Sequence, residues 1–201
     1  MSYFQPQKFT LLPPVVKNLL ILNGLFFLAT ITGLSSNINL YAPLAMHHWN
    51  SGDFRIWQPI TYMFMHGDFL HIFFNMWGVW MFGTQLENLW GSKRFLKFYI
   101  LTGLGAGILH FVLFPDGSLV GASGALFGLL LGFGMMFPNA QLMLIFLPVP
   151  IKAKYFVIIY GLIELYYGFT STGNIAHFAH LGGMLFGFLI IKYWEIQRNS
   201  S

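Results

Sequence analysis

The sequence predicts an all-α polytopic membrane protein in which six transmembrane helices form one bundle. Three observations lead to this prediction: the composition, the spacing of the apolar runs, and the distribution of the positive charges. Of the 201 residues, 56% are hydrophobic and only 8% are charged, and the mean hydropathy is +0.65. A soluble globule of this composition would leave extensive apolar surface in water, so soluble classes are excluded. The absence of cysteine also excludes disulfides and thiol nucleophiles.

Six apolar runs, separated by polar or Gly/Pro-rich segments, are candidates for membrane spans, since a helix needs roughly 20 apolar residues to cross a bilayer. The first run is longer than the apolar region of a signal peptide and lacks a convincing cleavage site, so we count it as a span. The segment 137–150 is predicted to be a loop with a short apolar piece at the cytoplasmic membrane interface. Together the spans fill the chain and predict a single membrane domain over residues 1–201. The predicted spans are 15–34, 58–83, 95–114, 121–137, 153–169 and 176–194.

The positive charges predict the orientation of these spans, because cytoplasmic loops collect Lys and Arg. Nine of the ten cationic residues precede or begin the first span, lie between spans two and three or four and five, or lie at the end of the chain. Only Arg55 falls on the opposite side. An even number of spans with both termini in the cytoplasm fits this pattern, so spans two, four and six begin at the extracytoplasmic face. The pattern also accounts for the pI of about 9.4 without a nucleic-acid partner, since no clustered basic face with exposed aromatic residues is present.

Two polar residues, Ser123 and His180, lie in apolar, glycine-rich segments near the extracytoplasmic ends of spans four and six. A serine hydroxyl becomes an effective nucleophile when a neighbouring base removes its proton, and neutral imidazole suits that role near pH 7. Each residue alone has a structural alternative, because a serine in a membrane helix usually bonds backbone or a neighbouring helix and a histidine can make a structural hydrogen bond. Small residues around the pair would let the two helices, or a scissile backbone, approach closely. These are Gly121, Gly124, Gly183 and Gly187.

Span two carries three further polar side chains in its first half, His66, His71 and Asn75. His71 and Asn75 are four residues apart and share a helix face. His66 lies about 140° from His71 around the predicted helix and is expected to face a different neighbour. The oxyanion formed when a serine attacks a carbonyl needs preorganised donors. His71, Asn75 and the backbone N–H of Ser123 at a helix N-terminus are candidates for them.

The other polar residues carry weaker functional signals. Glu87 and Glu164 are predicted to be structural partners for backbone or basic groups. The remaining histidines show no ligand-like partners, and we predict neither a metal site nor a cofactor. These histidines are His47, His48, His110 and His177.

The motifs named so far resemble those of the rhomboid family of intramembrane serine proteases, in a form with a minimal six-helix core. In that family a Gly-x-Ser-Gly motif on the fourth helix accompanies an Ala-His-x-x-Gly-x-x-x-Gly motif on the sixth, and the second helix carries His-x-x-x-x-His-x-x-x-Asn. These motifs correspond here to residues 121–124, 179–187 and 66–75. The resemblance covers nearly the whole chain from about Trp49 onward, with the motifs in order on the expected spans.

The resemblance implies cleavage of transmembrane protein substrates in the lipid bilayer by a dyad of Ser123 and His180, without a third acid. It implies that His71, Asn75 and the Ser123 amide line the oxyanion hole, and that His66 mainly supports a loop. The expected location is the bacterial inner membrane, with the active site open to the extracytoplasmic side. The oligomeric state stays open.

Two further features follow from the same resemblance. The first loop, which here contains Phe54 and Arg55 where the family usually has Trp-Arg, is expected to associate with the outer leaflet. Substrate is expected to enter past a mobile fifth helix, residues 153–169, and its cap loop, residues 168–175.

Other classes fit the sequence less well. A transporter would be expected to contain internal repeats or interrupted helices in corresponding halves, and no repeat is found. An inactive rhomboid relative that binds membrane proteins should have lost the serine, the histidine or the Gly-x-Ser motif, and all are present. The His-Glu-x-x-His motif of zinc proteases is absent. The Gly-x-Ser-x-Gly elbow of soluble hydrolases fails at Ala125.

Overall fold

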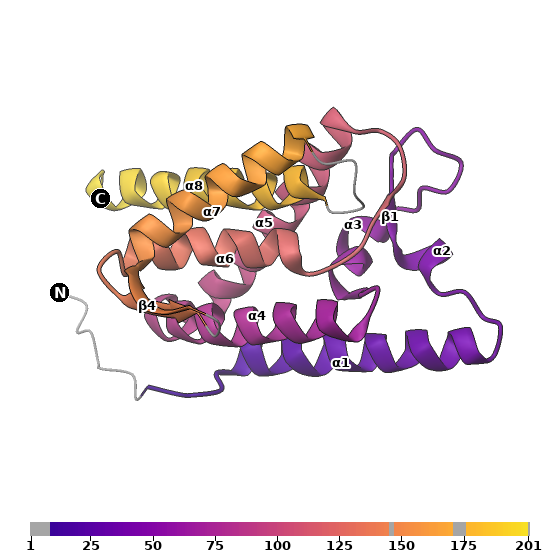
Figure 1. Ribbon diagram of the computed structural model, residues 1–201, viewed down its shortest axis with the longest axis horizontal. Helices are drawn as coiled ribbons and strands as arrows, with labels where there is room; N and C mark the ends of the chain where they lie inside the picture. Colours follow the sequence, from indigo (N-terminus) through magenta and orange to yellow (C-terminus); the bar gives the residue numbers. More distant parts are fainter. Residues whose placement is uncertain (1–8, 145–146, 171–175, 201) are drawn as a thin grey trace.

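A computed structural model describes residues 9–144, 147–170 and 176–200 of the chain. Most of the described residues are helical, and the longer helices pack as one bundle (Figure 1). The helix α8 lies against α5 and α6, α7 packs on α8 and α6, and α1 packs on α4. The six longer helices are α1 (Pro14–Ser35), α4 (Phe69–Trp90), α5 (Ser92–Leu113), α6 (Ser123–Met136), α7 (Ala153–Thr170) and α8 (His177–Asn199).

Five of the six predicted spans coincide with these helices to within a few residues, but the second does not. Residues 58–83 were predicted as one helix, whereas the structure has a short helix α3 (Gln58–Thr61), a 3₁₀ turn η1 (Tyr62–Phe64) and then a break. Met65 has extended backbone. Asp68 is the N-cap of α4, where its side chain accepts a hydrogen bond from the His71 N–H at 2.8 Å. This cap satisfies one of the free N–H groups of the first turn, so the helix begins eleven residues later than predicted.

The outer surface of the bundle is apolar, as expected for a protein in contact with lipid. Leu25 and Leu28 on α1 are 57% and 56% exposed, and Ile158 and Leu162 on α7 are 59% and 61% exposed. Among the described helices, α1 and α5 meet the length and hydropathy expected of a helix that crosses a membrane. Exposed apolar surface of this extent indicates an environment other than water.

The segment between α1 and α4 is folded rather than extended. It contains α2 (Tyr41–Leu44) and a two-residue strand β1 (Met46–His47), which pairs antiparallel with β2 (Ser118–Leu119) before α6. The Trp57 Nε1 donates to the Pro43 carbonyl at 2.8 Å, and the Thr61 hydroxyl donates to the Leu44 carbonyl at 2.7 Å. These two bonds join α2 to α3, and the pairing of β1 with β2 links the first loop to the residues before α6.

The segment between α6 and α7, predicted as a loop, forms a hairpin of β3 (Gln141–Leu144) and β4 (Leu147–Lys152). The strands pair antiparallel, with Gln141 opposite Lys152 and an irregularity between Leu142 and Leu144. Its backbone groups are therefore satisfied by strand pairing, a possibility that a short apolar run alone does not reveal. The predicted cap loop after α7 falls mainly on residues 171–175, which lie outside the described residues.

Glu87 fulfils the structural role predicted for it. Its carboxylate group is 2% exposed and accepts hydrogen bonds from the backbone N–H groups of Val15 and Val16 at 3.0 and 2.8 Å. The Ser92 hydroxyl donates to the same carboxylate at 2.6 Å. The charge lies at the N-terminus of α1, where a carboxylate is favoured by the helix dipole.

Glycines bring the backbones of α6 and α8 into direct contact. A Cβ added at Gly183 would overlap the Gly124 carbonyl oxygen, and a Cβ at Gly187 would lie 3.4 Å from the Gly128 Cα. Gly124 itself faces α5, where an added Cβ would overlap the Ala106 Cβ. The small faces predicted on spans four and six are therefore confirmed, and they leave no space for a side chain between the two helices.

This packing predicts that Gly183→Ala destabilises the protein. The new methyl group has to push α8 away from the Gly124 carbonyl, and overpacking of this kind costs about 1–3 kcal/mol. The measurement is the midpoint of thermal unfolding in detergent. The matched control is Gly24→Ala, since nothing lies within 4 Å of a Cβ at Gly24. An unchanged midpoint for Gly183→Ala would contradict the described α6–α8 contact.

Candidate active site

Ser123 and His180 meet at one end of the contact between α6 and α8. Ser123 is the first residue of α6, and His180 lies in the first turn of α8. The His180 Nε2 and the Ser123 Oγ are 2.9 Å apart, although 57 positions separate them in sequence. The two side chains are therefore within hydrogen-bond distance, as a nucleophile and its base need to be.

The start of α6 depends on Gly121, two residues before Ser123. Gly121 has a φ of +118°, a conformation that side chains with a Cβ rarely adopt. A Cβ at this position would also lie 2.7 Å from the His71 Nε2. Gly121 therefore lets the chain turn into α6 beside His71, with the Ser123 N–H among the free N–H groups of the first helical turn. Gly124, by contrast, serves packing against α5 rather than the approach of a substrate backbone.

The imidazole ring of His180 is held on two sides. Phe127, one turn after Ser123 on α6, stacks on it with ring centroids 4.1 Å apart and an interplanar angle of 3°. On the other side, the Glu164 Oε2 lies 2.9 Å from the His180 Nδ1. The ring therefore presents Nε2 to the serine and Nδ1 to a carboxylate.

Glu164 makes two contacts that the sequence analysis did not predict. The expected pair had no third acid, yet the Glu164 carboxylate contacts the ring nitrogen of His180 that faces away from Ser123. His177 was expected to have no ligand-like partner, yet its Nδ1 lies 2.7 Å from the same Glu164 oxygen. Both histidines are on α8 and Glu164 is on α7, so the side chains meet only when these helices pack together. The carboxylate oxygen of Glu164 and one ring nitrogen from each histidine are also close enough together to hold a metal ion.

His71 and Asn75 lie beside the pair on α4. The Asn75 Nδ2 donates to the His71 carbonyl of its own helix at 2.8 Å, which uses one of its two hydrogens. The Asn75 Oδ1 is buried and has no hydrogen-bond partner among the described residues. The His71 Nδ1 accepts a hydrogen bond from the Gly67 N–H at 3.3 Å, so its Nε2 is left facing the Gly121 turn.

His66 occupies a different place from the one predicted. It lies in the break before α4, not on the helix, so the predicted angle of about 140° from His71 does not apply. Its ring packs edge-on against the ring of His71, with centroids 4.9 Å apart. The side chain is fully buried, its Nε2 lies 3.5 Å from the Ala122 N, and its carbonyl accepts from the Tyr41 hydroxyl at 2.7 Å. His66 thus connects the first loop, the break and the start of α6.

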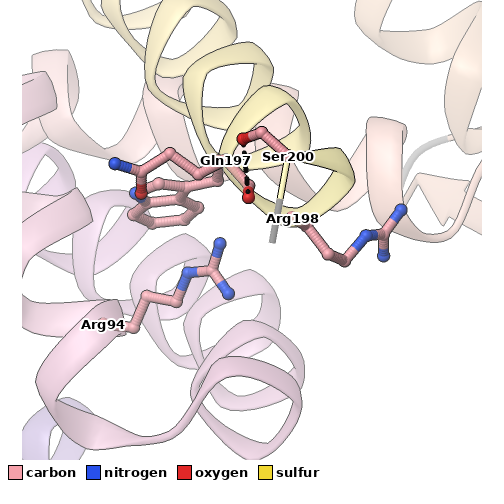
Figure 2. Close-up of a pocket in the computed structure, with 5 residues that line it drawn as sticks. Arg94, Gln197, Arg198 and Ser200 are labelled. Atoms are coloured by element: carbon pink, nitrogen blue, oxygen red, sulfur yellow. Dashed lines mark hydrogen bonds between the residues drawn. The ribbon is translucent and has the colours of Figure 1, made fainter.

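A cavity of about 1090 Å³ lies over these residues. Its lining includes Ser123, His180, His71 and Asn75, so the candidate nucleophile, base and oxyanion donors face one space. A second cavity, of about 640 Å³, lies at the other end of α8 (Figure 2). That cavity is lined by Arg94, Trp194, Gln197, Arg198 and Ser200. It has no histidine or carboxylate among its lining residues, so it offers no comparable base.

Comparison with known proteins assigns the family. The sequence model of the rhomboid domain matches residues 53–194, which include every residue of the candidate site. The chain belongs to the rhomboid family. Rhomboids are integral membrane proteins, which agrees with the composition and with the apolar surface of the bundle.

Several named rhomboids are similar to this one. It is 34% identical to the rhomboid protease GluP of Bacillus subtilis over 165 residues, 82% of this chain and 31% of that protein. It is also 34% identical to the mitochondrial rhomboid protein 1 of Saccharomyces cerevisiae, over 67% of this chain and 42% of that protein. The rhomboid-like protease 3 of Toxoplasma gondii is 30% identical, over 71% of this chain and 53% of that protein. The alignments thus span about a third to a half of the length of these relatives.

Sequence reasoning missed three contacts in this rhomboid. Phe127 is four residues after Ser123, so helical spacing alone would have placed both on one face. Glu164 is the only acidic residue in the predicted fifth span, and an ionisable group at such a position is a functional candidate. His177 precedes His180 by three residues and shares its face, yet only the packing of α7 on α8 shows which carboxylate both histidines contact.

Proposed function

We propose that this rhomboid is an intramembrane serine endopeptidase that hydrolyses peptide bonds in or near the transmembrane segments of other membrane proteins. The observation that carries the proposal is the 2.9 Å contact between the Ser123 Oγ and the His180 Nε2 inside a cavity. A serine and an imidazole at this distance can exchange a proton. A serine with a purely structural role in an apolar helix does not need an imidazole beside it. The name of the Bacillus subtilis relative, a rhomboid protease, supports the same activity.

In the proposed reaction, Ser123 is the nucleophile and His180 is the general base and acid. The Ser123 Oγ attacks the scissile carbonyl carbon while its proton moves to the His180 Nε2. The same proton then passes to the leaving amine as the C–N bond breaks. A water molecule attacks the acyl-enzyme, gives its proton to His180, and releases the acid product as Ser123 recovers its hydrogen.

We assign the oxyanion hole to the Ser123 N–H, His71 and Asn75. The first N–H groups of α6 are free to donate, and the helix dipole favours negative charge at this end. Among the described residues the Asn75 Nδ2 uses one of its two hydrogens, within α4, so the second can donate to a substrate oxyanion. His66 and Gly121 support these donors through their contacts with His71 and the start of α6.

The proposed arrangement is a single domain, residues 1–201, with six spans and both termini in the cytoplasm. Arg94 at the start of α5 and Arg198 at the end of α8 line one cavity at the end of the bundle away from Ser123 (Figure 2). Clustering of cations at that end supports a cytoplasmic position for it. The active site then opens to the extracytoplasmic side, and the first loop associates with the outer leaflet.

We place the protein in the bacterial inner membrane, in keeping with its similarity to the Bacillus subtilis relative. Its partners in this proposal are the lipid bilayer and transmembrane protein substrates, which reach the cavity from the membrane beside α7.

The first prediction concerns the nucleophile. Ser123→Ala should fold and insert normally and should lose cleavage of a model transmembrane substrate in detergent or liposomes, because no hydroxyl remains to form the acyl-enzyme. The readout is product formation on a gel. Ser35→Ala, at the exposed end of α1, is the matched control and should cleave at the wild-type rate. Full cleavage by Ser123→Ala would show that hydrolysis does not use Ser123 as its nucleophile, and would overturn the proposed mechanism.

The second prediction concerns the oxyanion hole. Asn75→Ala should lower kcat by roughly 10²–10³, the usual cost of removing one oxyanion donor, with little change in KM. Asn88→Ala is a matched control, because Asn88 also donates to the carbonyl four residues before it on α4 but lies far from the cavity. Equal rates for the two variants would remove Asn75 from the oxyanion hole.

The third prediction concerns topology. The natural chain has no cysteine, so a single introduced thiol reports its own location. In intact cells, a membrane-impermeant maleimide should label Asp53→Cys in the first loop but should label Ser200→Cys only after permeabilisation. Labelling of Ser200→Cys in intact cells would place the C-terminus outside the cytoplasm.

A further inference from the structure

Glu164 is a carboxylate in an otherwise apolar helix. Of the three buried residues of α7, Glu164 is the only polar one, and it is 6% exposed. A buried carboxylate is costly unless it is paired, and among the described residues its hydrogen-bond partners both lie on α8. Its Oε2 lies 2.9 Å from the His180 Nδ1 and 2.7 Å from the His177 Nδ1.

The contact with His180 completes a line of hydrogen bonds from Glu164 through the imidazole to Ser123. For Nε2 to accept the serine proton, it must carry a lone pair, and the ring hydrogen must therefore be on Nδ1. A carboxylate that accepts from Nδ1–H selects this tautomer and orients the ring. It also stabilises the imidazolium that forms when the serine proton arrives. Glu164 stays ionised throughout, so the only proton that moves is the one between Ser123 and the His180 Nε2.

We propose that Glu164 is a positioning residue for His180, so that this rhomboid acts through a Ser123–His180–Glu164 triad rather than a dyad. The inference rests on the proposed proteolytic function and deepens it. The His177 Nδ1 lies 2.7 Å from the same oxygen and makes a second contact with the carboxylate. Phe127 limits rotation of the ring, and Glu164 sets which of its nitrogens carries the hydrogen.

Other titratable groups near His180 do not supply this role. His71 on α4 and His110 on α5 line the same cavity, and neither is bonded to His180. Among the described residues, Glu164 is the only acidic side chain in hydrogen-bond contact with the ring. If Glu164 served only to join α7 to α8, its replacement would not change the reactivity of His180 as long as the imidazole ring stayed in place.

The test compares Glu164→Gln, Glu164→Asp and Val157→Ala in detergent, with a model transmembrane substrate and with a fluorophosphonate probe. In the probe reaction the Ser123 Oγ attacks phosphorus, fluoride leaves, and the serine proton moves to His180. Val157 is the matched control, because it is buried on α7 near Gly134 and does not contact His180. His180→Ala, which lacks the base, sets the floor for probe labelling.

Glu164→Gln should lower kcat by roughly 10⁴, the order of magnitude found when the acid of a serine protease triad is replaced, with little change in KM. Probe labelling should slow in parallel, Glu164→Asp should recover part of the rate, and Val157→Ala should stay near wild type. A wild-type rate for Glu164→Gln overturns the inference. So does an equal loss in Val157→Ala, or a rise in KM with unchanged kcat.

A second measurement uses the unaltered protein and does not depend on the folding of a variant. The ¹⁵N spectrum of histidine-labelled protein, with His180 assigned by its loss in His180→Ala, should show hydrogen on Nδ1. Hydrogen on Nε2 alone would overturn the inference. Failure of the inference differs from failure of the proposed function: in the second case the wild-type protein would not cleave the substrate, or Ser123→Ala would cleave it at the wild-type rate.

Discussion

The direct backbone contact between α6 and α8 is the constraint on which the rest of the site depends. With no side chain at Gly183, α8 approaches α6 until its backbone meets the Gly124 carbonyl. Interiors are close-packed and resist small changes of volume, so this contact sets the separation of the helix ends that carry Ser123 and His180. Their hydrogen bond therefore rests on packing several residues away rather than on the flexibility of the two side chains.

The remaining parts of the site are attached to this helix pair from three directions. The break before α4 places His66 against the start of α6, and α4 itself presents His71 and Asn75 to the cavity. The Gly121 turn brings the start of α6 close to His71. The Gly67 N–H donates to the His71 Nδ1 and the Asn75 Nδ2 donates to the His71 carbonyl, so bonds that stabilise the start of α4 also orient these polar side chains.

Much of this could be predicted from the sequence, and the exceptions have physical causes. Apolar periodicity and cation placement indicated the helices, and the glycine spacing indicated which two of them touch. The break at Met65 was missed because it is short and apolar residues continue on both sides of it, although Gly67 and the Asp68 cap mark where α4 begins. Glu164 was predicted to be a structural partner for backbone or basic groups, but the two histidines that it contacts were not predicted. Contact between α7 and α8 depends on tertiary packing, which local sequence does not encode.

The position of Glu164 on α7 has a consequence for coupling between motion and reactivity. Ser123 and His180 belong to helices locked by glycine contacts, whereas the acid belongs to a helix that buries few of its side chains. A displacement of α7 would withdraw the carboxylate and leave the serine and histidine at an unchanged distance. A ligand or substrate that displaces α7 would therefore alter which nitrogen of the His180 imidazole carries hydrogen. By thermodynamic linkage, the protonation state of His180 would shift the position of α7 by an equal free energy.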